Sequence, residues 1–170
     1  MGNAQMLGTS DAVTTQGEAV VEAARKLIPV LRQQGAAISQ ARRIPQEIME
    51  MLREARLTQL LRPARFGGRE IGADVIFRVA RELAKGDGSV AWVYSVTSTH
   101  DHLIGLFPLE VQEEYWSSST PVSASSYMPS GKATPAQGGY TLSGKWWFCS
   151  RIENSDPCPL PALRARWTST

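Results

Sequence analysis

The sequence predicts an α+β protein, with a helical domain at residues 17–117 followed by part of an antiparallel β domain at residues 118–156. Two observations support this prediction. Before Ser117, apolar residues recur at the three- and four-residue spacing of amphipathic helices. After Ser117, serine, threonine, proline and glycine dominate, and the apolar period shortens toward two, which is typical of short strands.

The N-terminal residues 1–16 are polar, with neither a basic start nor an apolar centre. We therefore expect a flexible leader and no signal peptide. A first helix is predicted over residues 17–39, with a kink or a shifted start at Pro29, because proline lacks the N–H that an interior helical position uses. Its apolar face comprises Val20, Val21, Ala24, Leu27, Ile28 and Leu31.

A second helix is expected to open at Ile44-Pro45, because proline is favoured in the first turn of a helix. Glycines and Pro63 then indicate a loop over residues 60–72. Within it, Arg65-Phe66-Gly67-Gly68 is expected to form a tight turn with a structural role, because glycine adopts backbone conformations that other residues avoid. The apolar face of the second helix comprises Ile48, Met51, Leu52 and Ala55.

Three further helices complete the predicted helical domain. A third spans residues 73–85, and Gly86-Asp87-Gly88-Ser89 ends it and supplies caps for a fourth at residues 89–106. The fourth segment is apolar on most faces, as expected for a helix buried among others. The fifth begins at Pro108 and ends near Trp116.

Strands are predicted at residues 122–125, 140–143 and 145–150, with a glycine turn at residues 138–139. In the last of these strands, alternation would place Trp146, Phe148 and Ser150 on one face. The segment 157–170 is rich in proline and shows no strand alternation. We interpret it either as an independent tail or, preferably, as the product of a reading-frame shift near Asp156.

Bulk composition excludes several classes of function. The 170-residue chain is 42% hydrophobic and 20% charged, and its net charge of +2 is too small to indicate nucleic-acid binding. No apolar run approaches the roughly 18 residues of a membrane span. Its two cysteines, Cys149 and Cys158, form neither a disulfide framework nor a zinc spacing. We expect a cytoplasmic protein with no membrane or nucleic-acid partner.

Local spacing also excludes some chemistry. His100 and His102 lie two residues apart, about 200° around a helix, so they cannot converge on one metal ion. Ser126 and Ser150 lack the Gly-x-Ser-x-Gly context of a nucleophile. Gly86-x-Gly88 follows no predicted strand, so a dinucleotide-binding turn is not indicated. Without further context, a single histidine on a mostly apolar helix, such as His100, is usually a core or capping residue. Core packing would also explain Trp92, Trp146 and Trp147.

Four segments in this order resemble a known family. They are Gly86-Asp87-Gly88-Ser89-Val90-Ala91-Trp92, Thr99-His100-Asp101-His102, Ser125-Ser126-Tyr127-Met128-Pro129-Ser130-Gly131, and Gly144, Trp146, Phe148 and Ser150 of the motif Gly-x-Trp-x-Phe-x-Ser. Together they are similar to acyl-CoA dehydrogenase-fold flavin monooxygenases, the oxygenase components of two-component aromatic hydroxylases such as 4-hydroxyphenylacetate 3-monooxygenase. The TEPxxGSD-like segment of the dehydrogenase branch is absent from residues 125–131.

This resemblance implies a reaction. A separate flavin reductase supplies reduced flavin, FMN or FAD, and molecular oxygen adds to it as a C4a-hydroperoxide that hydroxylates a phenol-like aromatic substrate. Members of the family are homotetramers. They also carry a C-terminal helical bundle, which the resemblance implies is missing here. We therefore expect weak or absent activity from this chain alone.

The resemblance also implies roles for individual residues. Ser150 matches a catalytic serine near flavin N5, and Ser126 matches a serine that faces both flavin and substrate. His100 matches the histidine that binds or deprotonates the phenolic hydroxyl, and Trp92 matches a wall of the substrate pocket. If Ser150 faces the flavin, Trp146 and Phe148 share that side. Arg151 departs from the family, which usually has glycine there.

Two alternatives remain open at this point. The chain could belong to an acyl-CoA dehydrogenase that oxidises a thioester through FAD, or it could be a non-catalytic helical module that associates with helical partners. Exposed apolar faces on the helices at residues 20–31 and 89–106 would favour the module.

Overall fold

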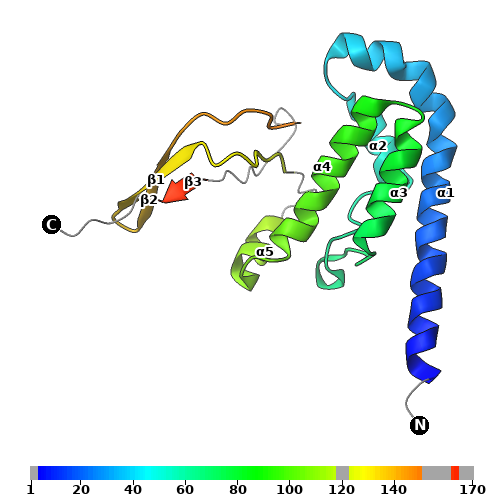
Figure 1. Cartoon of the computed structure of the whole chain (residues 1–170), viewed down its shortest axis with the longest axis horizontal. Coiled ribbons are helices and arrows are strands. Elements are labelled where there is room, and N and C mark those ends of the chain that lie inside the picture. The colour runs from blue at the N-terminus through cyan, green and yellow to red at the C-terminus, as the bar shows by residue number, and fades with distance from the viewer. Residues whose placement is uncertain (1–3, 118–122, 151–161, 165–170) are drawn as a thin grey trace. The chain divides into compact units, whose positions relative to one another are not determined.

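The computed structural model describes the backbone of residues 4–117, 123–150 and 162–164, and the side chains of residues 15–117 and 123–150. The chain forms two compact units, Met1–Trp116 and Ser117–Thr170 (Figure 1). This division coincides with the change of composition at Ser117, where the sequence predicts the end of the helical part.

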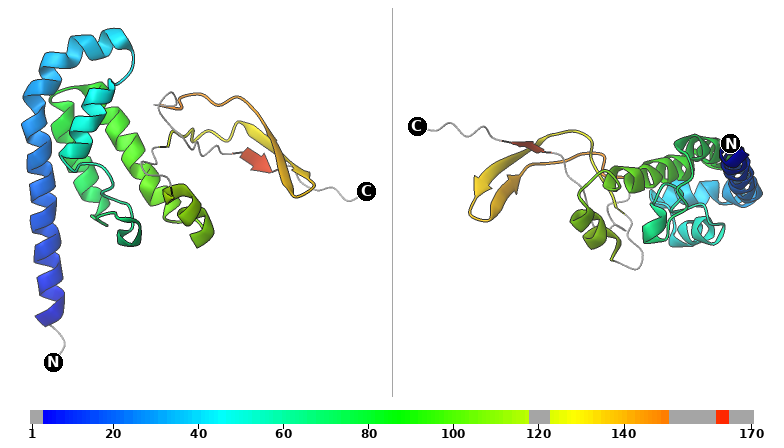
Figure 2. Two further views of the ribbon diagram at one scale, coloured as in Figure 1. Left: turned by 180° about the vertical axis from the view of Figure 1, so that it is seen from behind. Right: turned by 90° about the horizontal axis from the view of Figure 1, so that it is seen from below.

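The first unit is helical. Helix α3 contacts both α1 and α4, so these three helices form one layer with α3 in the middle (Figures 1 and 2). A short 3-10 turn lies in the loop that leads to α3. The elements are α1 (Ala4–Ala41), α2 (Gln46–Glu54), η1 (Ala64–Phe66), α3 (Ala73–Ala84), α4 (Gly88–Ile104) and α5 (Leu109–Trp116).

The core of this unit forms because each amphipathic helix turns its apolar stripe inward. Most of the apolar positions expected for the first two helices are buried, so the predicted periodicity is confirmed there. On α2, Met49 is buried while Met51 is only partly buried. The buried core residues of the four longest helices include Val20, Val21, Ala24, Leu31, Ile48, Leu52, Val75, Ile76, Val79, Leu83, Val90, Ala91 and Tyr94.

Helix α1 differs from the prediction at its start. It begins at Ala4, so residues 4–16, expected to form a flexible leader, are helical. Pro29 lies inside α1, which continues to Ala41. Proline removes one backbone hydrogen bond from a helix, but buried residues on both sides of it, such as Ala24 and Leu31, hold α1 in the core.

The predicted break between the third and fourth helices is confirmed. The Asp87 side chain caps α4, because its Oδ1 accepts a hydrogen bond from the Val90 N–H at 2.9 Å. Gly86 allows the turn to approach α1 closely. A Cβ at Gly86 would lie 2.7 Å from the Cβ of Leu31, closer than packed carbon atoms tolerate.

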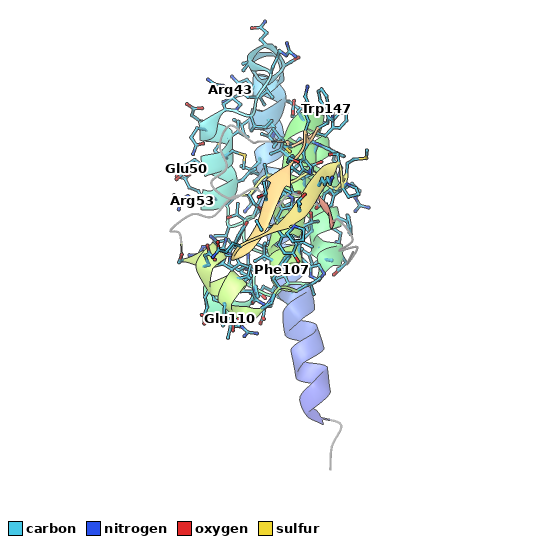
Figure 3. The ribbon with its side chains drawn as sticks, turned by 90° about the vertical axis from the view of Figure 1, so that its left-hand side faces the viewer. Arg43, Glu50, Arg53, Phe107, Glu110 and Trp147 are labelled. Carbon is cyan, nitrogen blue, oxygen red and sulfur yellow. The ribbon has the colours of Figure 1, made fainter. Side chains whose placement is uncertain are left out.

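The outward face of α2 is charged. Glu50 and Arg53, three residues apart, form an exposed ion pair there (Figure 3). Burial of Ile48, Met49 and Leu52 on the opposite side makes α2 amphipathic. Pro45 lies at the N-cap of α2, one position before the first turn in which it was expected.

The second unit contains a small mixed sheet. Strands β1 (Gly131–Ala136) and β2 (Gly139–Ser143) form an antiparallel hairpin through a two-residue turn at Gln137-Gly138, where Gly138 has a φ of 80°. Strand β3 (Ala162–Arg164) pairs with β1 in parallel, giving the order β2-β1-β3. The predicted fold class, helices followed by a partial β domain, is confirmed.

The strands themselves match the prediction only in part. The strand at residues 140–143 and its glycine turn are present, but β1 was not predicted, because Pro135 and the polar residues around it hide its alternation. Strand β3 pairs only with residues 131–133, so Pro135 lies where β1 has a neighbour on one side. Strand β3 also falls within the segment 157–170, where none was expected; the rest of that segment, and Arg151, lie outside the described residues.

The predicted strand at residues 145–150 is wrong. Residues 144–149 have no regular secondary structure, and Phe148 has a φ of 60°, which breaks an extended backbone. The segment instead folds back on the start of β1. The Ser130 hydroxyl donates to the Lys145 carbonyl at 2.9 Å, and the Trp146 ring lies against Gly131 so closely that a Cβ there would collide with it. Residues 123–125 also form no strand, and Val122 lies outside the described residues.

Candidate functional site

Helix α4 carries the two candidate residues of the helical unit, Trp92 and His100. His100 is buried, with 1% of its surface exposed, whereas Trp92 is 64% exposed. Eight residues separate them, which corresponds to about 12 Å along a helix and about 80° around it. The two side chains therefore leave α4 in different directions. His102 is exposed.

Next to His100, a buried carboxylate joins three segments of the helical unit. Asp101 pairs with Arg62 of the loop before η1, with 3.5 Å between Asp101 Oδ2 and Arg62 Nε. On its other side, the Trp116 Nε1–H of α5 donates to Asp101 Oδ1 at 3.3 Å. Burial raises the pKa of Asp101, and Arg62, Trp116 and His100 oppose that rise. The Asp101 carboxylate is therefore held in an environment that only partly compensates its charge.

The loop that presents Arg62 is shaped by its glycines. Gly67 has a φ of 78°, and a Cβ at Gly68 would collide with the Arg62 carbonyl, so both positions require glycine. Backbone N–H groups of Phe66 and Gly68 both donate to the Pro63 carbonyl, at 3.0 and 3.1 Å. The structural role predicted for the Arg65–Gly68 turn is thus confirmed.

The Gln112 side chain of α5 donates hydrogen bonds to backbone carbonyls just beyond the C-terminal end of α4. Its Nε2 donates to the carbonyls of Gly105 and Phe107, at 3.1 and 2.7 Å. These carbonyls follow the last turn of α4, where backbone acceptors lack partners within the helix. The turn between α4 and α5 is therefore fixed by a buried side chain rather than by packing alone.

Tyr94 occupies the middle of α4 and faces the apolar core. Burial raises its pKa well above the usual value, and the nearby Ser98 hydroxyl opposes this only weakly. Its hydroxyl has no hydrogen-bond partner of good geometry in the described part of the chain. Tyr94 thus behaves as a packing residue and not as an acid or base near neutral pH.

In the second unit, residues 123–126 are buried although they form no strand. Ser126 is 4% exposed, and its Oγ finds no hydrogen-bond partner among the described residues. A buried hydroxyl without a partner costs free energy, on the order of 1–3 kcal/mol. The Ser126 hydroxyl is therefore available to a ligand that enters beside it.

The other candidates of this unit surround residues 144–150. Ser150 is half-buried, and its N–H donates to the Phe148 carbonyl at 2.9 Å. Trp146 is half-buried against Gly131 and Gly144, whereas Phe148 is 92% exposed. The expectation that Trp146, Phe148 and Ser150 share one face is wrong, because it depended on a strand that does not form.

The donor set of the second unit fits a flavin in kind. An isoalloxazine ring offers carbonyl and nitrogen acceptors to hydroxyl donors and a flat surface to aromatic rings. The Ser126 hydroxyl is such a donor, and Trp147 and Phe148 present exposed rings, with the Lys145 ammonium 4.2 Å above the Trp147 ring. The predicted flavin contacts Ser126, Trp146, Phe148 and Ser150 thus offer hydroxyls and aromatic rings of the kinds that could hold a flavin, and Trp147 adds an exposed ring that was not predicted.

The described residues contain no group of three histidine, cysteine, aspartate or glutamate side chains placed to hold a metal ion. Within the same residues, no helix is both long and apolar enough to cross a membrane.

Sequence reasoning missed the contacts around Asp101. Arg62 follows two leucines, and Asp101 lies in a helix that is otherwise mostly apolar, so each is a charge in an apolar context. That signal indicates buried charges, which are almost always paired. It does not identify the partners, because 39 residues separate positions 62 and 101 and no local period connects them.

The fold and the arrangement of helices define an acyl-CoA dehydrogenase-type helical domain. The family model described as "Acyl-CoA dehydrogenase, N-terminal domain" matches residues 14–120. The chain belongs to this family.

Within the family, the chain is similar to aromatic-ring monooxygenases, which confirms the resemblance predicted from the four segments. It is 33% identical over 130 residues to the flavin-dependent monooxygenase oxygenase subunit HsaA of Rhodococcus jostii, a match that covers 76% of this chain and 34% of that protein. It is 28% identical over 141 residues to the p-hydroxyphenylacetate 3-hydroxylase oxygenase component of Acinetobacter baumannii, covering 82% and 33%.

Solved structures agree. The crystal structure of 3-HSA hydroxylase from Rhodococcus sp. RHA1 superposes with a TM-score of 0.82 and 30% identity, covering 86% of this chain and 38% of that one. XiaF from Streptomyces sp., solved with FADH2 and glycerol, shares the fold with a TM-score of 0.85 at 24% identity, covering 92% and 40%. The chain thus spans about a third of the length of the curated relatives that it matches.

Proposed function

We propose that this chain provides the N-terminal helical domain and the start of the flavin-contacting β domain of an oxygenase component, in a two-component flavin-dependent monooxygenase. The proposed substrate is a phenol-like aromatic compound. The relatives described above are oxygenase components, and the FADH2-dependent resorcinol hydroxylase of Rhizobium sp. is 32% identical over 127 residues. Both resorcinol and p-hydroxyphenylacetate carry a phenolic hydroxyl, which favours this substrate class.

The observation that carries the proposal is the buried, unpartnered hydroxyl of Ser126. Buried polar side chains are normally hydrogen-bonded, so an exception in a native fold calls for a partner. The resemblance of residues 125–131 to the family segment supports a position for Ser126 beside both a flavin and an aromatic ring. A ligand with hydrogen-bonding groups would supply the missing partner.

When bound, the reduced flavin supplies the activation of molecular oxygen for transfer of one oxygen atom to the ring. The chain's own residues would prepare the substrate. His100 would accept the phenolic proton at an imidazole nitrogen, because a group with an ordinary pKa near 6.5 suits a base at neutral pH. Its burial limits the access of water, which would promote loss of hydrogen peroxide before the oxygen atom is transferred to the ring.

The remaining candidates would position the two rings. The Ser126 hydroxyl would bond to flavin or substrate, and Ser150 would hold the flavin near its N5. Trp92 would contribute aromatic surface to the substrate, and Trp146 and Phe148 to the flavin. We further propose a flavin reductase as partner, since relatives are named as oxygenase components, and a homotetramer as the working assembly.

Neither alternative is favoured by a specific feature of the structure. An acyl-CoA dehydrogenase shares the helical domain, but the relatives named above are monooxygenases or hydroxylases. The non-catalytic module would need exposed apolar faces on the first and fourth helices. On α1 the stripe Val20, Val21, Ala24 and Leu31 is buried, and on α4 Trp92 is the apolar residue with the greatest exposure.

The test is the binding of reduced flavin under nitrogen. Reduced FMN and reduced FAD are titrated separately into the wild-type chain, and binding is followed by flavin absorbance and fluorescence. We expect saturable binding of one or both. Ser126→Ala and Ser150→Ala should each weaken it about 2- to 12-fold, the equivalent of one hydrogen bond of about 0.5–1.5 kcal/mol.

Ser143→Ala is the matched control, because Ser143 is an exposed serine of β2 in the same unit. Its flavin affinity should equal that of the wild type. Absence of saturable binding for both flavins, or equal losses in all three variants, would overturn the proposal. Bleaching of bound oxidised flavin by an acyl-CoA would instead establish the dehydrogenase alternative. Binding is the readout because little turnover is expected from this chain alone.

A further inference from the structure

Asp101 lies where three segments of the helical unit meet: α4, the loop before η1, and the end of α5. Its carboxylate is paired with Arg62 Nε at 3.5 Å and accepts from Trp116 Nε1 at 3.3 Å. All three residues are buried. We call Arg62, Asp101 and Trp116 the Asp101 clamp.

Both partners of Asp101 are themselves held in place. The Phe66 ring packs on Trp116 with 4.5 Å between ring centroids, and the Arg62 guanidinium lies 5.9 Å from the centroid of the same indole. The glycine turn at Gly67-Gly68 fixes the loop that carries Phe66 and Arg62. The Trp116 indole, whose N–H donates to Asp101, is therefore held by contacts with both Phe66 and Arg62.

The Asp101 clamp lies at the C-terminal end of α4, which is outside the main apolar cluster. Val90, Ala91 and Tyr94 of α4 belong to the main apolar cluster, but no residue of α4 beyond Tyr94 does. The buried residues of the last turns are instead Ser98, His100, Asp101 and Ile104. Two polar contacts of Asp101 therefore act on the rotation of this end of α4: the directional hydrogen bond from Trp116, and the ion pair with Arg62, whose Nε makes no hydrogen bond of good geometry among the described residues.

Rotation of the helix matters for His100. A side-chain tip lies about 6 Å from the helix axis, so a rotation of about 10° moves it by about 1 Å. A misplacement of about 1 Å at a reacting group can cost about 100-fold in rate. Since Asp101 is the next residue after His100, any contact that fixes the rotation of α4 at Asp101 also fixes it at His100.

We propose that Asp101 is a positioning residue: held between Arg62 and Trp116, it sets the rotation of the last turns of α4 and thereby the placement of the His100 imidazole. The role of His100 on a phenol rests on the proposed function, whereas its placement by the clamp does not.

The chemistry of the clamp is suited to specifying a geometry. A buried ion pair contributes little net stability, because desolvation offsets its attraction, and the raised pKa of Asp101 indicates that desolvation outweighs the attraction here. An apolar trio of the same volume would pack at least as stably. It would not discriminate between rotations of α4 as a hydrogen-bonded carboxylate does.

The test uses the two histidines of the chain, whose ring signals are observed by carbon–proton NMR. His102, exposed and on the other side of Asp101 in sequence, is the internal reference. Arg62→Gln and Trp116→Phe each remove one partner of Asp101 from a distant segment. We expect both to displace the His100 signals and to leave those of His102 in place, and Arg62→Lys to restore part of the wild-type position.

Arg81→Gln, which removes an exposed arginine of α3, is the matched control and should move neither histidine. If Arg62→Gln and Trp116→Phe lower the unfolding midpoint but leave the His100 signals unchanged, the clamp is only structural and the proposal fails. Equal displacement of His100 and His102 also overturns it, since that indicates general loosening.

A binding experiment distinguishes a failure of this proposal from a failure of the proposed function. With reduced flavin present under nitrogen, 4-hydroxyphenylacetate is titrated into the wild type, Arg62→Gln and Arg81→Gln. We expect Arg62→Gln alone to weaken binding, by about 2- to 12-fold, the equivalent of one hydrogen bond to the phenol. If the wild type binds neither flavin nor phenol, the proposed function fails, while the NMR displacement still decides the role of Asp101.

Discussion

Helix α4 is buried along most of its length, but its two halves are buried by different groups. The N-terminal half packs Val90, Ala91 and Tyr94 into the apolar core. The C-terminal half buries Ser98, His100 and Asp101, and Asp101 is held by an arginine and an indole N–H from other segments. The same helix thus serves as a packing element at one end and as a support for polar groups at the other.

The two kinds of burial differ in how closely they fix the rotation of α4. Apolar burial is non-directional, so it stabilises a helix without fixing its rotation closely. Hydrogen bonds weaken steeply as their angles depart from linearity, so they fix rotation at some cost in desolvation. The costly arrangement occurs next to His100, the residue that we propose to act on the substrate.

The largest loss of stability is expected from removing the ion pair in the C-terminal, polar half of α4. Arg62→Leu leaves the Asp101 carboxylate buried without its cation and should lower the free energy of unfolding by about 3–5 kcal/mol. The double variant Arg62→Leu/Asp101→Leu should recover to within about 1 kcal/mol of the wild type. Urea unfolding followed by circular dichroism measures both. Losses that simply add in the double variant would contradict the pairing.

Two changes to phenylalanine compare the halves directly. Trp116→Phe removes the donor to Asp101 together with part of a buried ring, and the lost hydrogen bond alone should cost about 1–3 kcal/mol, because a buried acceptor loses its partner. Tyr94→Phe removes a buried hydroxyl that has no well-placed partner and should be neutral or slightly stabilising. Thermal and urea unfolding of the two variants give the answer. A comparable loss in both would mean that the halves do not differ in this way.

A smaller effect is expected at the start of the apolar half. Asp87→Ala removes the N-cap of α4 and should lower stability by about 1 kcal/mol. Ser89→Ala, an exposed position in the same turn, serves as the control and should change stability by less than about 0.5 kcal/mol. Equal effects of the two variants in urea unfolding would exclude a capping role for Asp87.

The smallest effect on stability is expected at Trp92. Because its side chain is largely exposed, Trp92→Ala should change the free energy of unfolding by no more than about 0.5 kcal/mol. If Trp92 contributes to the substrate site, the same variant should weaken 4-hydroxyphenylacetate binding in the presence of reduced flavin. A large loss of stability would instead place Trp92 in the core of the unit.

The sequence predicted the helical part well because its signals are local. The apolar stripes of α1, the Asp87 cap and the turn at Gly67-Gly68 each occupy a few consecutive residues. The second unit was harder to predict. Pro135 concealed β1, and the alternation of residues 145–150 suggested a strand that the left-handed backbone of Phe148 prevents.

The candidate site residues came from the resemblance and stay predictions, whereas the contacts that support them could not be predicted from the sequence. His100, Ser126 and Ser150 were singled out by the resemblance, and the structure shows His100 and Ser126 buried. The Asp101 clamp was missed because it joins residues 62, 101 and 116, which no periodicity connects. Such long-range polar contacts depend on how the helices pack, and no single segment of the sequence determines that packing.

The central proposal is that the His100 imidazole contacts a phenol in the presence of reduced flavin. Nuclear Overhauser effects measured under nitrogen test this contact directly. The ring protons of 4-hydroxyphenylacetate should show effects to the His100 imidazole and none to the exposed His102 imidazole. Effects to His102 instead, or to neither histidine while the phenol is bound, would contradict the account.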